Sequence, residues 1–181
     1  MEQKTVKIEN SELTARLFGS FDVNVRTLED AFGVRIQNRA GEDSDAVTVS
    51  GEDAEGVRMA AEAVRYLKDM ARYNEFVTEQ QVGYVVDMIR DGRGEELSGL
   101  EQDCICITTR GKPIKAKTVG QRRYVDAIEK NTVVFGIGPA GTGKTFLAVA
   151  MAVQAFKAHE INRIILTRPA VEAGERLGFL P

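Results

Sequence analysis

The sequence predicts an α/β protein made of two units: a small α+β unit over residues 1–93 and the beginning of a parallel α/β unit over 104–181, joined by a linker at 94–103. Three observations support this fold class. The apolar pattern changes repeatedly between strand and helix periods. The net charge changes sign, with 12 basic and 18 acidic residues in 1–93 but 12 basic and 9 acidic residues in 94–181. A glycine-rich segment, Gly138–Thr145, lies between an apolar run and an apolar helical pattern.

Composition excludes several classes of protein. With 43% hydrophobic and 28% charged residues in 181, the chain has enough apolar surface for a folded core, which argues against wholesale disorder. No apolar stretch reaches the 18 residues of a membrane-spanning helix. The first seven residues lack the apolar stretch of a secretion signal, so we expect a cytoplasmic protein without a membrane partner.

The first unit alternates short strands with amphipathic helices. Apolar spacing and turn residues predict its elements in this order: strand 5–9, helix 11–18 with Ser11 as N-cap, helix 27–32 ended by Gly33, strand 34–37, polar turn 40–45, strand 46–49, helix 53–73 and helix 80–89. The linker that follows is rich in glycine and charge.

The second unit begins with a hairpin and continues with the alternation typical of parallel sheets. Its predicted elements are strands 104–108 and 114–117, helix 121–130, buried strand 132–137, helix 144–158 and buried strand 163–167. A doubly wound sheet usually has five or more strands, and only two core strands are predicted here. We therefore expect the chain to be the front part of a longer protein.

The strongest motif is Gly138-Pro139-Ala140-Gly141-Thr142-Gly143-Lys144-Thr145, which matches the G-x-x-x-x-G-K-T phosphate-binding loop. Its backbone amides and the following helix N-terminus attract phosphate. Lys144 is predicted to contact the β- and γ-phosphates, and the Thr145 hydroxyl to ligate Mg²⁺. These residues predict a P-loop NTPase core, with ATP and Mg²⁺ as ligands and Lys144 and Thr145 as its catalytic groups.

Gln121 is the candidate for recognising the base. It lies 17 residues before Gly138, and a glutamine amide can donate to and accept from the N6/N7 edge of adenine. The spacing resembles the adenine-reading glutamine of helicase-type ATPases, which favours ATP over GTP. A surface glutamine without a ligand is the alternative.

The loop, together with the segment 163–181, resembles the PhoH-like family of P-loop ATPases, which are similar to the core of superfamily 1 helicases. The resemblance covers essentially the whole chain and is most specific from Gln121 onward. It implies an ATPase linked to RNA metabolism and phosphate starvation. By the comparison with helicases, Thr167, Arg168 and Arg176 are candidates for contacting single-stranded nucleic acid.

The first unit resembles a KH RNA-binding module, which places a G-x-x-G loop between two helices. Gly19-Ser20-Phe21-Asp22 has that position, but Asp22 replaces the second glycine. A KH loop approaches phosphates closely, and a carboxylate there repels them. The spacing predicts a KH-like fold, and a structural or protein-docking role is at least as well supported as direct RNA binding.

A basic run offers a second surface for a polyanion. Between residues 104 and 125 there are six cations and no acid: Arg110, Lys112, Lys115, Lys117, Arg122 and Arg123. RNA is expected on this run rather than on the first unit, whose net charge is −6. A solvated face is the alternative.

No acidic residue after Thr145 ends an apolar strand, so the Mg²⁺-holding carboxylate of a P-loop ATPase is not found. We therefore expect ATP hydrolysis by a full-length protein and not by this piece. The alternatives are a P-loop kinase and a nucleotide-sensing adaptor that recruits a ribosomal or ribonuclease partner. Homo-oligomerisation is left open.

Overall fold

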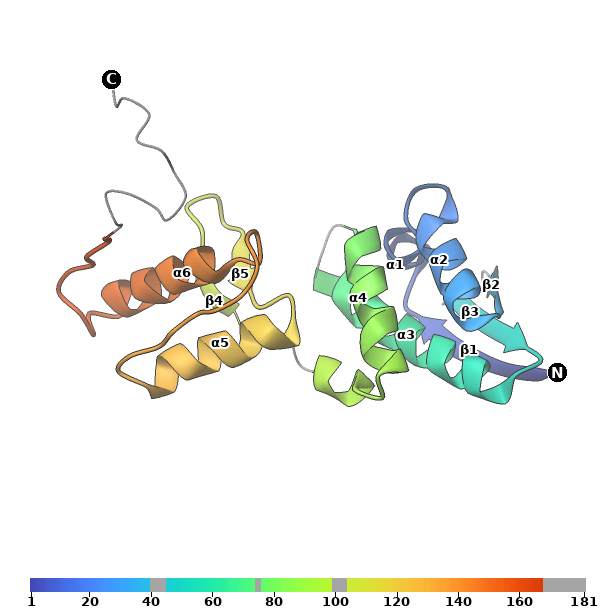
Figure 1. The fold of residues 1–181 in the computed structure, drawn as a ribbon. Helices are drawn as coiled ribbons and strands as arrows, with labels where there is room; N and C mark the ends of the chain where they lie inside the picture. The colour runs from blue at the N-terminus through green and yellow to red at the C-terminus, as the bar shows by residue number, and fades with distance from the viewer. Residues whose placement is uncertain (40–44, 74–75, 99–103, 168–181) are drawn as a thin grey trace, which may run out of the picture. The chain divides into compact units, whose positions relative to one another are not determined.

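A computed structural model describes residues 1–39, 45–73, 76–98 and 104–167. The chain divides into two compact units, the first formed by residues 1–104 and 115–123, the second by 105–114 and 124 onward. Both contain helices together with a small antiparallel sheet (Figure 1). Within the described ranges, no helix combines the length and the apolar character needed to cross a membrane.

The first unit is built around a three-stranded sheet. In chain order its elements are β1 (Glu2–Ile8), α1 (Ser11–Phe18), the 3₁₀ turn η1 (Ser20–Asp22), α2 (Val23–Phe32), β2 (Arg35–Arg39), β3 (Asp45–Gly51), α3 (Ala54–Tyr73), α4 (Glu79–Arg90) and the 3₁₀ turn η2 (Gly94–Leu97). The strand order is β1-β3-β2, with β3 antiparallel to both neighbours. β1 is consequently an edge strand.

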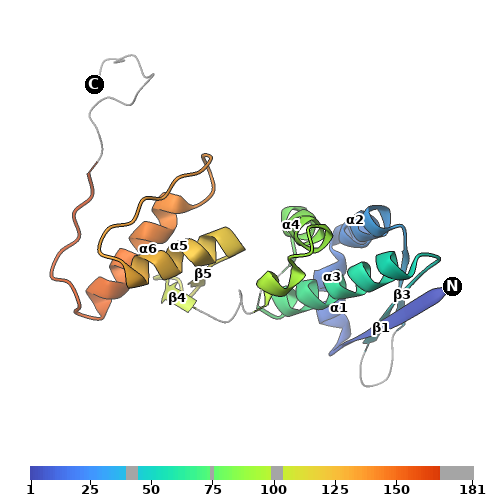
Figure 2. The same ribbon diagram turned by 60° about the horizontal axis from the view of Figure 1, so that its bottom comes forward.

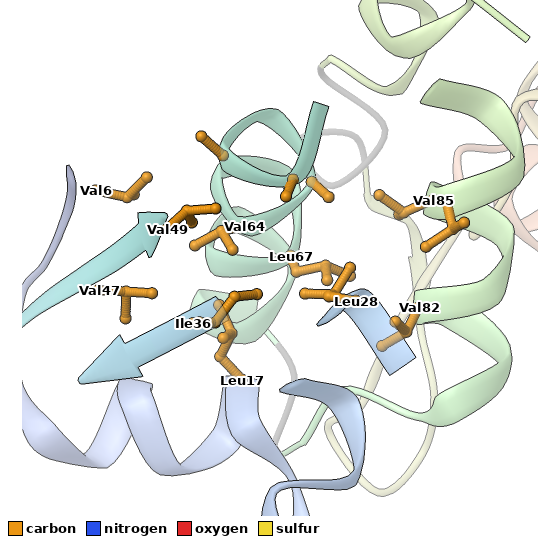
Figure 3. Packing of buried hydrophobic residues seen from close by; sticks show 14 of the residues in the cluster. Val6, Leu17, Leu28, Ile36, Val47, Val49, Val64, Leu67, Val82 and Val85 are labelled. Atoms are coloured by element: carbon orange, nitrogen blue, oxygen red, sulfur yellow. The ribbon is translucent and has the colours of Figure 1, made fainter. Parts of the chain in front are cut away.

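The core of this unit lies between the sheet and its helices. Val47 and Val49 of β3 are fully buried, and so are Val64 and Leu67 of α3, which packs against β1 and β3 (Figures 2 and 3). The i, i+3 spacing of Val64 and Leu67 places both side chains on one face of the helix, which is why the apolar pattern predicts this element well. Leu28 from α2 joins the same core.

Two boundaries of the first unit differ from the prediction. Ser11 was expected to cap α1, but it is the first helical residue, and the cap is Asn10, whose Oδ1 accepts a hydrogen bond from the Leu13 amide at 2.8 Å. α2 begins at Val23, four residues before its predicted start. It ends as expected at Gly33, whose φ of 65° suits a glycine.

Part of the predicted linker is folded. Gly94–Leu97 form the 3₁₀ turn η2, and Leu97 is buried in the core of the first unit. The reason is that η2 packs against α3 and α4. Burial of the Leu97 side chain there stabilises the folded turn, although the residues around it are polar. Residues 99–103 of the predicted linker and residues 40–44 of the predicted turn lie outside the described residues.

Two helix glycines of this unit make a matched test of its packing. A Cβ added at Gly56 in α3 would lie 2.5 Å from the Phe32 carbonyl oxygen, whereas one at Gly83 in α4 meets nothing within 4 Å. Gly56→Ala should therefore lower the free energy of unfolding by about 1–3 kcal/mol. Gly83→Ala should raise it by about 0.5–1 kcal/mol through helix propensity. Urea unfolding of both variants checks this; a stabilised Gly56→Ala contradicts the close packing.

The second unit has a smaller core. Its elements are β4 (Cys104–Ile107), β5 (Pro113–Lys115), α5 (Val119–Lys130) and α6 (Lys144–Lys157). The first turn of α5 is assigned to the first unit. β4 and β5 form the predicted hairpin. The two helices lie side by side (Figures 1 and 2). The buried residues come from β4, α5 and α6, and they are Ile105, Val125, Leu147, Ala150 and Met151.

The two buried strands predicted over 132–137 and 163–167 are wrong. Neither segment has regular secondary structure, and Phe135, Ile137 and Ile165 are 85%, 95% and 75% exposed. A buried strand needs hydrogen-bonding neighbours on both sides, and within the described residues no strand pairs with either segment. Both segments are apolar, but an apolar composition does not provide the neighbouring strands that a buried strand needs.

Candidate functional site

The glycine-rich loop leads directly into the longest helix of the second unit. Residues 138–143 lie in the loop, and Lys144 and Thr145 are the first two residues of α6, as predicted from the sequence. Gly141 and Gly143 have φ values of 77° and 84°, a left-handed conformation that suits glycine. These two residues turn the chain sharply before the helix begins.

The N-terminus of α6 has no side-chain cap. Gly143 occupies the cap position and contributes no side-chain hydrogen bond. The Gly143 carbonyl accepts from the Leu147 amide at 2.9 Å, so the amides of Lys144, Thr145 and Phe146 precede the hydrogen-bond ladder of the helix. A 14-residue helix concentrates partial positive charge at this end. The arrangement is suited to an anion.

Lys144 folds back over the loop. Its Nζ donates to the carbonyl oxygens of Gly138 at 2.8 Å and Pro139 at 2.6 Å, and lies 3.3 Å from Thr142 Oγ1. Thr142 in turn donates to the Pro139 carbonyl at 3.0 Å. The ammonium group is thus held at the centre of the loop by oxygen atoms that a phosphate oxygen could replace. Both residues partly organise the loop before any ligand arrives.

Thr145 and Ala140 complete the predicted loop set. Thr145 is exposed in the first turn of α6, and its hydroxyl makes no hydrogen bond within the described part of the chain. It is therefore available to a metal ion. Ala140 is exposed in the turn between Pro139 and Gly141. Uncapped amides, an inward ammonium and an available hydroxyl fit the phosphates of a nucleotide and its Mg²⁺.

Tyr124 is a positioning residue that was not singled out from the sequence. A Cβ at Gly136 would lie 3.1 Å from its ring, so the segment leading to the loop passes close to this tyrosine. Gly136 could have indicated this contact from the sequence, because a glycine inside an apolar run often marks a place where another group approaches the backbone closely. Tyr124 helps to define the path by which the chain enters the loop.

Gln121 belongs to the first unit, whereas the loop belongs to the second. Its side-chain Oε1 accepts from the Lys117 amide at 2.7 Å, and its own amide lies 3.2 Å from Thr118 Oγ1. The adenine-reading role of Gln121 stays a prediction.

The basic run divides between the two units. Arg110 and Lys112 lie exposed at the β4–β5 turn of the second unit, and the other four cations belong to the first. Arg123 pairs with Glu96 at 2.8 Å, and hydrogen bonds from Arg93 and Arg123 help to lower the pKa of the Glu96 carboxyl. Part of the charge of the run is therefore neutralised.

The segment 167–176 is described only at its first residue. Thr167 is exposed and lies outside regular structure, while Arg168 and Arg176 lie outside the described residues. Their predicted contact with single-stranded nucleic acid stays a prediction.

Comparison with known proteins gives consistent matches. The family described as PhoH-like protein matches residues 113–181. A PhoH-like protein of Mycobacterium bovis is 46% identical over 170 residues, which are 94% of this chain and 47% of that protein. One from Bacillus subtilis is 41% identical over 175 residues, covering 97% and 53%, and Protein PhoH of Escherichia coli K12 is 33% identical over 154 residues, covering 82% and 41%. No solved structure gives a significant match. The chain thus spans about half the length of the curated relatives it matches.

Proposed function

The chain belongs to the PhoH-like protein family, and from this premise we propose that its loop Gly138–Thr145 binds the phosphates of ATP with Mg²⁺. The observation that carries the proposal is the position of Lys144, whose Nζ lies among loop oxygens at 2.6–3.3 Å directly before an uncapped helix N-terminus. An ammonium group at that place neutralises β- and γ-phosphate charge.

In the full-length protein we propose that bound ATP is hydrolysed in the cytoplasm and that hydrolysis is coupled to RNA. Phosphoryl transfer needs charge neutralisation, which Lys144 supplies, and a metal ion, which Thr145 would hold. It also needs a carboxylate that holds Mg²⁺ and positions water. Among the described residues after the loop, the acid is Glu160, which lies beyond the far end of α6, about 20 Å from Thr145 by helix rise.

The first unit supports the RNA-associated part of this proposal through its topology. Its order β1-α1-α2-β2-β3-α3, with a sheet ordered β1-β3-β2 and a loop between α1 and α2, suits a KH-like module. The loop Gly19–Asp22 joins the two helices as the sequence pattern requires. Asp22 brings a negative charge to that loop and weakens the case for phosphate binding there.

One observation favours the adaptor as a second candidate function. Phe21, at the tip of the α1–α2 loop, is 92% exposed and has a φ of 55°. Asp22 beside it has a φ of 57°, so two successive non-glycine residues are held in the left-handed region at a cost of about 1–2 kcal/mol each. An exposed aromatic ring held on a strained loop suits docking to a protein partner, such as a ribosomal protein or a ribonuclease.

The proposal is tested by titrating the 181-residue chain with a fluorescent ATP analogue, with and without Mg²⁺. We expect saturable binding that Mg²⁺ strengthens and unlabelled ATP reverses, together with negligible phosphate release. Thr145→Ala should keep the binding seen without Mg²⁺ and lose the strengthening by Mg²⁺, because the hydroxyl that would hold the metal is removed while Lys144 and the loop amides remain. Absence of saturable binding would contradict the proposed function, and rapid phosphate release would contradict the expected need for a further carboxylate.

A further inference from the structure

A cationic groove lies in the first unit between the edge strand β1 and the helix α3, which run beside each other (Figures 1 and 2). It is a hollow of about 420 Å³. Its lining contains four cations, a hydroxyl and two small apolar side chains: Lys4, Thr5, Val6, Lys7, Ala61, Arg65 and Lys68. No residue of the α1–α2 loop lines the groove.

The fold explains why these residues meet. Ala61, Arg65 and Lys68 have the i, i+4, i+7 spacing that places side chains on one face of a helix. Within the described sheet, β1 pairs only with β3. The other edge of β1 therefore has no neighbouring strand. Because Ala61 is small and buried, the wall of the groove is hollow at that point. Cations about 60 residues apart in the sequence thus line one channel.

Arginines of α3 offset part of the acidic charge beside the groove. Two arginines of α3 pair with the nearby carboxylates: Arg58 with Glu55 and Glu62, and Arg72 with Glu9 and Asp69. Within the described residues, none of the four groove cations forms an ion pair. The hydrogen bond from Arg58 lowers the pKa of the Glu55 carboxyl, and the charge of Lys4 adds to that effect. The net charge of −6 over residues 1–93 therefore conceals a local positive strip.

We propose that this groove binds the phosphodiester backbone of single-stranded nucleic acid. Lys4 shares the α3-facing side of β1 with the buried Val6, and Arg65 and Lys68 lie on the helix beside it. Three cations thus line one path for a phosphodiester chain, which carries a negative charge at every nucleotide. Lys68 Nζ donates to the Lys7 carbonyl oxygen at 3.5 Å, and Val6 and Ala61 add an apolar floor. The inference rests on the proposed RNA association for its choice of polymer, but not on ATP binding.

The test compares two charge-reversal variants of the 181-residue chain in binding a fluorescein-labelled 12-mer of oligouridylate. Lys4→Glu/Arg65→Glu alters two exposed groove cations. Arg26→Glu/Arg35→Glu alters two exposed cations on α2 and β2 and changes the net charge equally. We expect the groove variant to weaken binding at least tenfold at low salt. It should also reduce the slope of log affinity against log salt by about 1.4, since each contact to single-stranded phosphate contributes about 0.7.

The control variant should retain affinity within about twofold and keep the original salt slope. Equal weakening in both variants would mean that only net charge matters and would overturn the proposal, as would an unchanged groove variant. Competition by polyglutamate as effective as by unlabelled oligouridylate would assign the groove to an acidic protein instead. Circular dichroism confirms folding, and the fluorescent ATP analogue should bind both variants equally, so failure of the groove is distinguishable from failure of nucleotide binding.

Discussion

Replacing Lys144 by alanine should weaken ATP binding by about 10- to 150-fold, which corresponds to about 1.5–3 kcal/mol for hydrogen bonds made by a charged group. The side chain removed is the ammonium group that donates to Gly138 and Pro139 within the loop. Titration with the fluorescent ATP analogue measures the loss. Because Lys144 is the first residue of an exposed helix start, we expect the fold and the unfolding transition to remain close to those of the wild-type chain.

Lys130→Ala is the matched control for this substitution. Lys130 is exposed at the last position of α5, and its removal changes the net charge by the same amount. It should leave ATP affinity within about twofold. If the folded Lys144→Ala chain bound ATP as tightly as the Lys130→Ala chain, Gly138–Thr145 would not be the phosphate site.

Replacing Asn24 by aspartate should lower the free energy of unfolding by about 3–5 kcal/mol at neutral pH. Asn24 is 1% exposed, and its Nδ2 donates to the carbonyl oxygens of Leu17 at 2.9 Å and Val77 at 3.0 Å. A carboxylate of the same shape has no donor for these oxygens and buries a negative charge against them. Urea unfolding measured by circular dichroism gives the loss.

The loss should depend on pH with a definite sign. Burial and the two facing carbonyl oxygens raise the pKa of the introduced carboxyl in the folded state above its unfolded value of about 3.9. Protons then bind more strongly to the folded chain, so the penalty is smallest below pH 4 and grows as pH rises toward the folded-state pKa. Asn10→Asp is the control, because Asn10 uses its Oδ1 to cap α1 and aspartate caps equally well. Equal effects of the two substitutions would refute the role assigned to Asn24.

Helices were the part of the fold that sequence periodicity predicted best. The amphipathic pattern located α3 and α4 within one residue at each end, and Gly33 marked the end of α2. The reason is that a helix satisfies its backbone hydrogen bonds within its own segment, so that its evidence is local. The hairpin β4–β5 was found for a similar reason, since a short turn brings its strands together.

Strands 132–137 and 163–167 were predicted from apolar runs that are present but exposed. A strand takes its hydrogen bonds from other segments, and periodicity within six residues cannot tell whether those segments are in place. The cap of α1 was misplaced by one residue because Asn10 and Ser11 are both good capping types, and only the backbone geometry distinguishes them.

The sequence by itself determined the phosphate-loop motif, the order of the helices and the sign of the charge in each region, because these depend on neighbouring residues. Only the tertiary structure decided which distant groups meet. Asn24 joins Leu17 to Val77, and Lys4 of β1 lines one groove with Arg65 and Lys68 of α3, although net charge alone had predicted an anionic unit. Arg58 and Arg72 form ion pairs with the neighbouring acids and so offset part of the negative charge beside the groove. Electrostatic potential depends on distances in space, which a count along the chain does not contain.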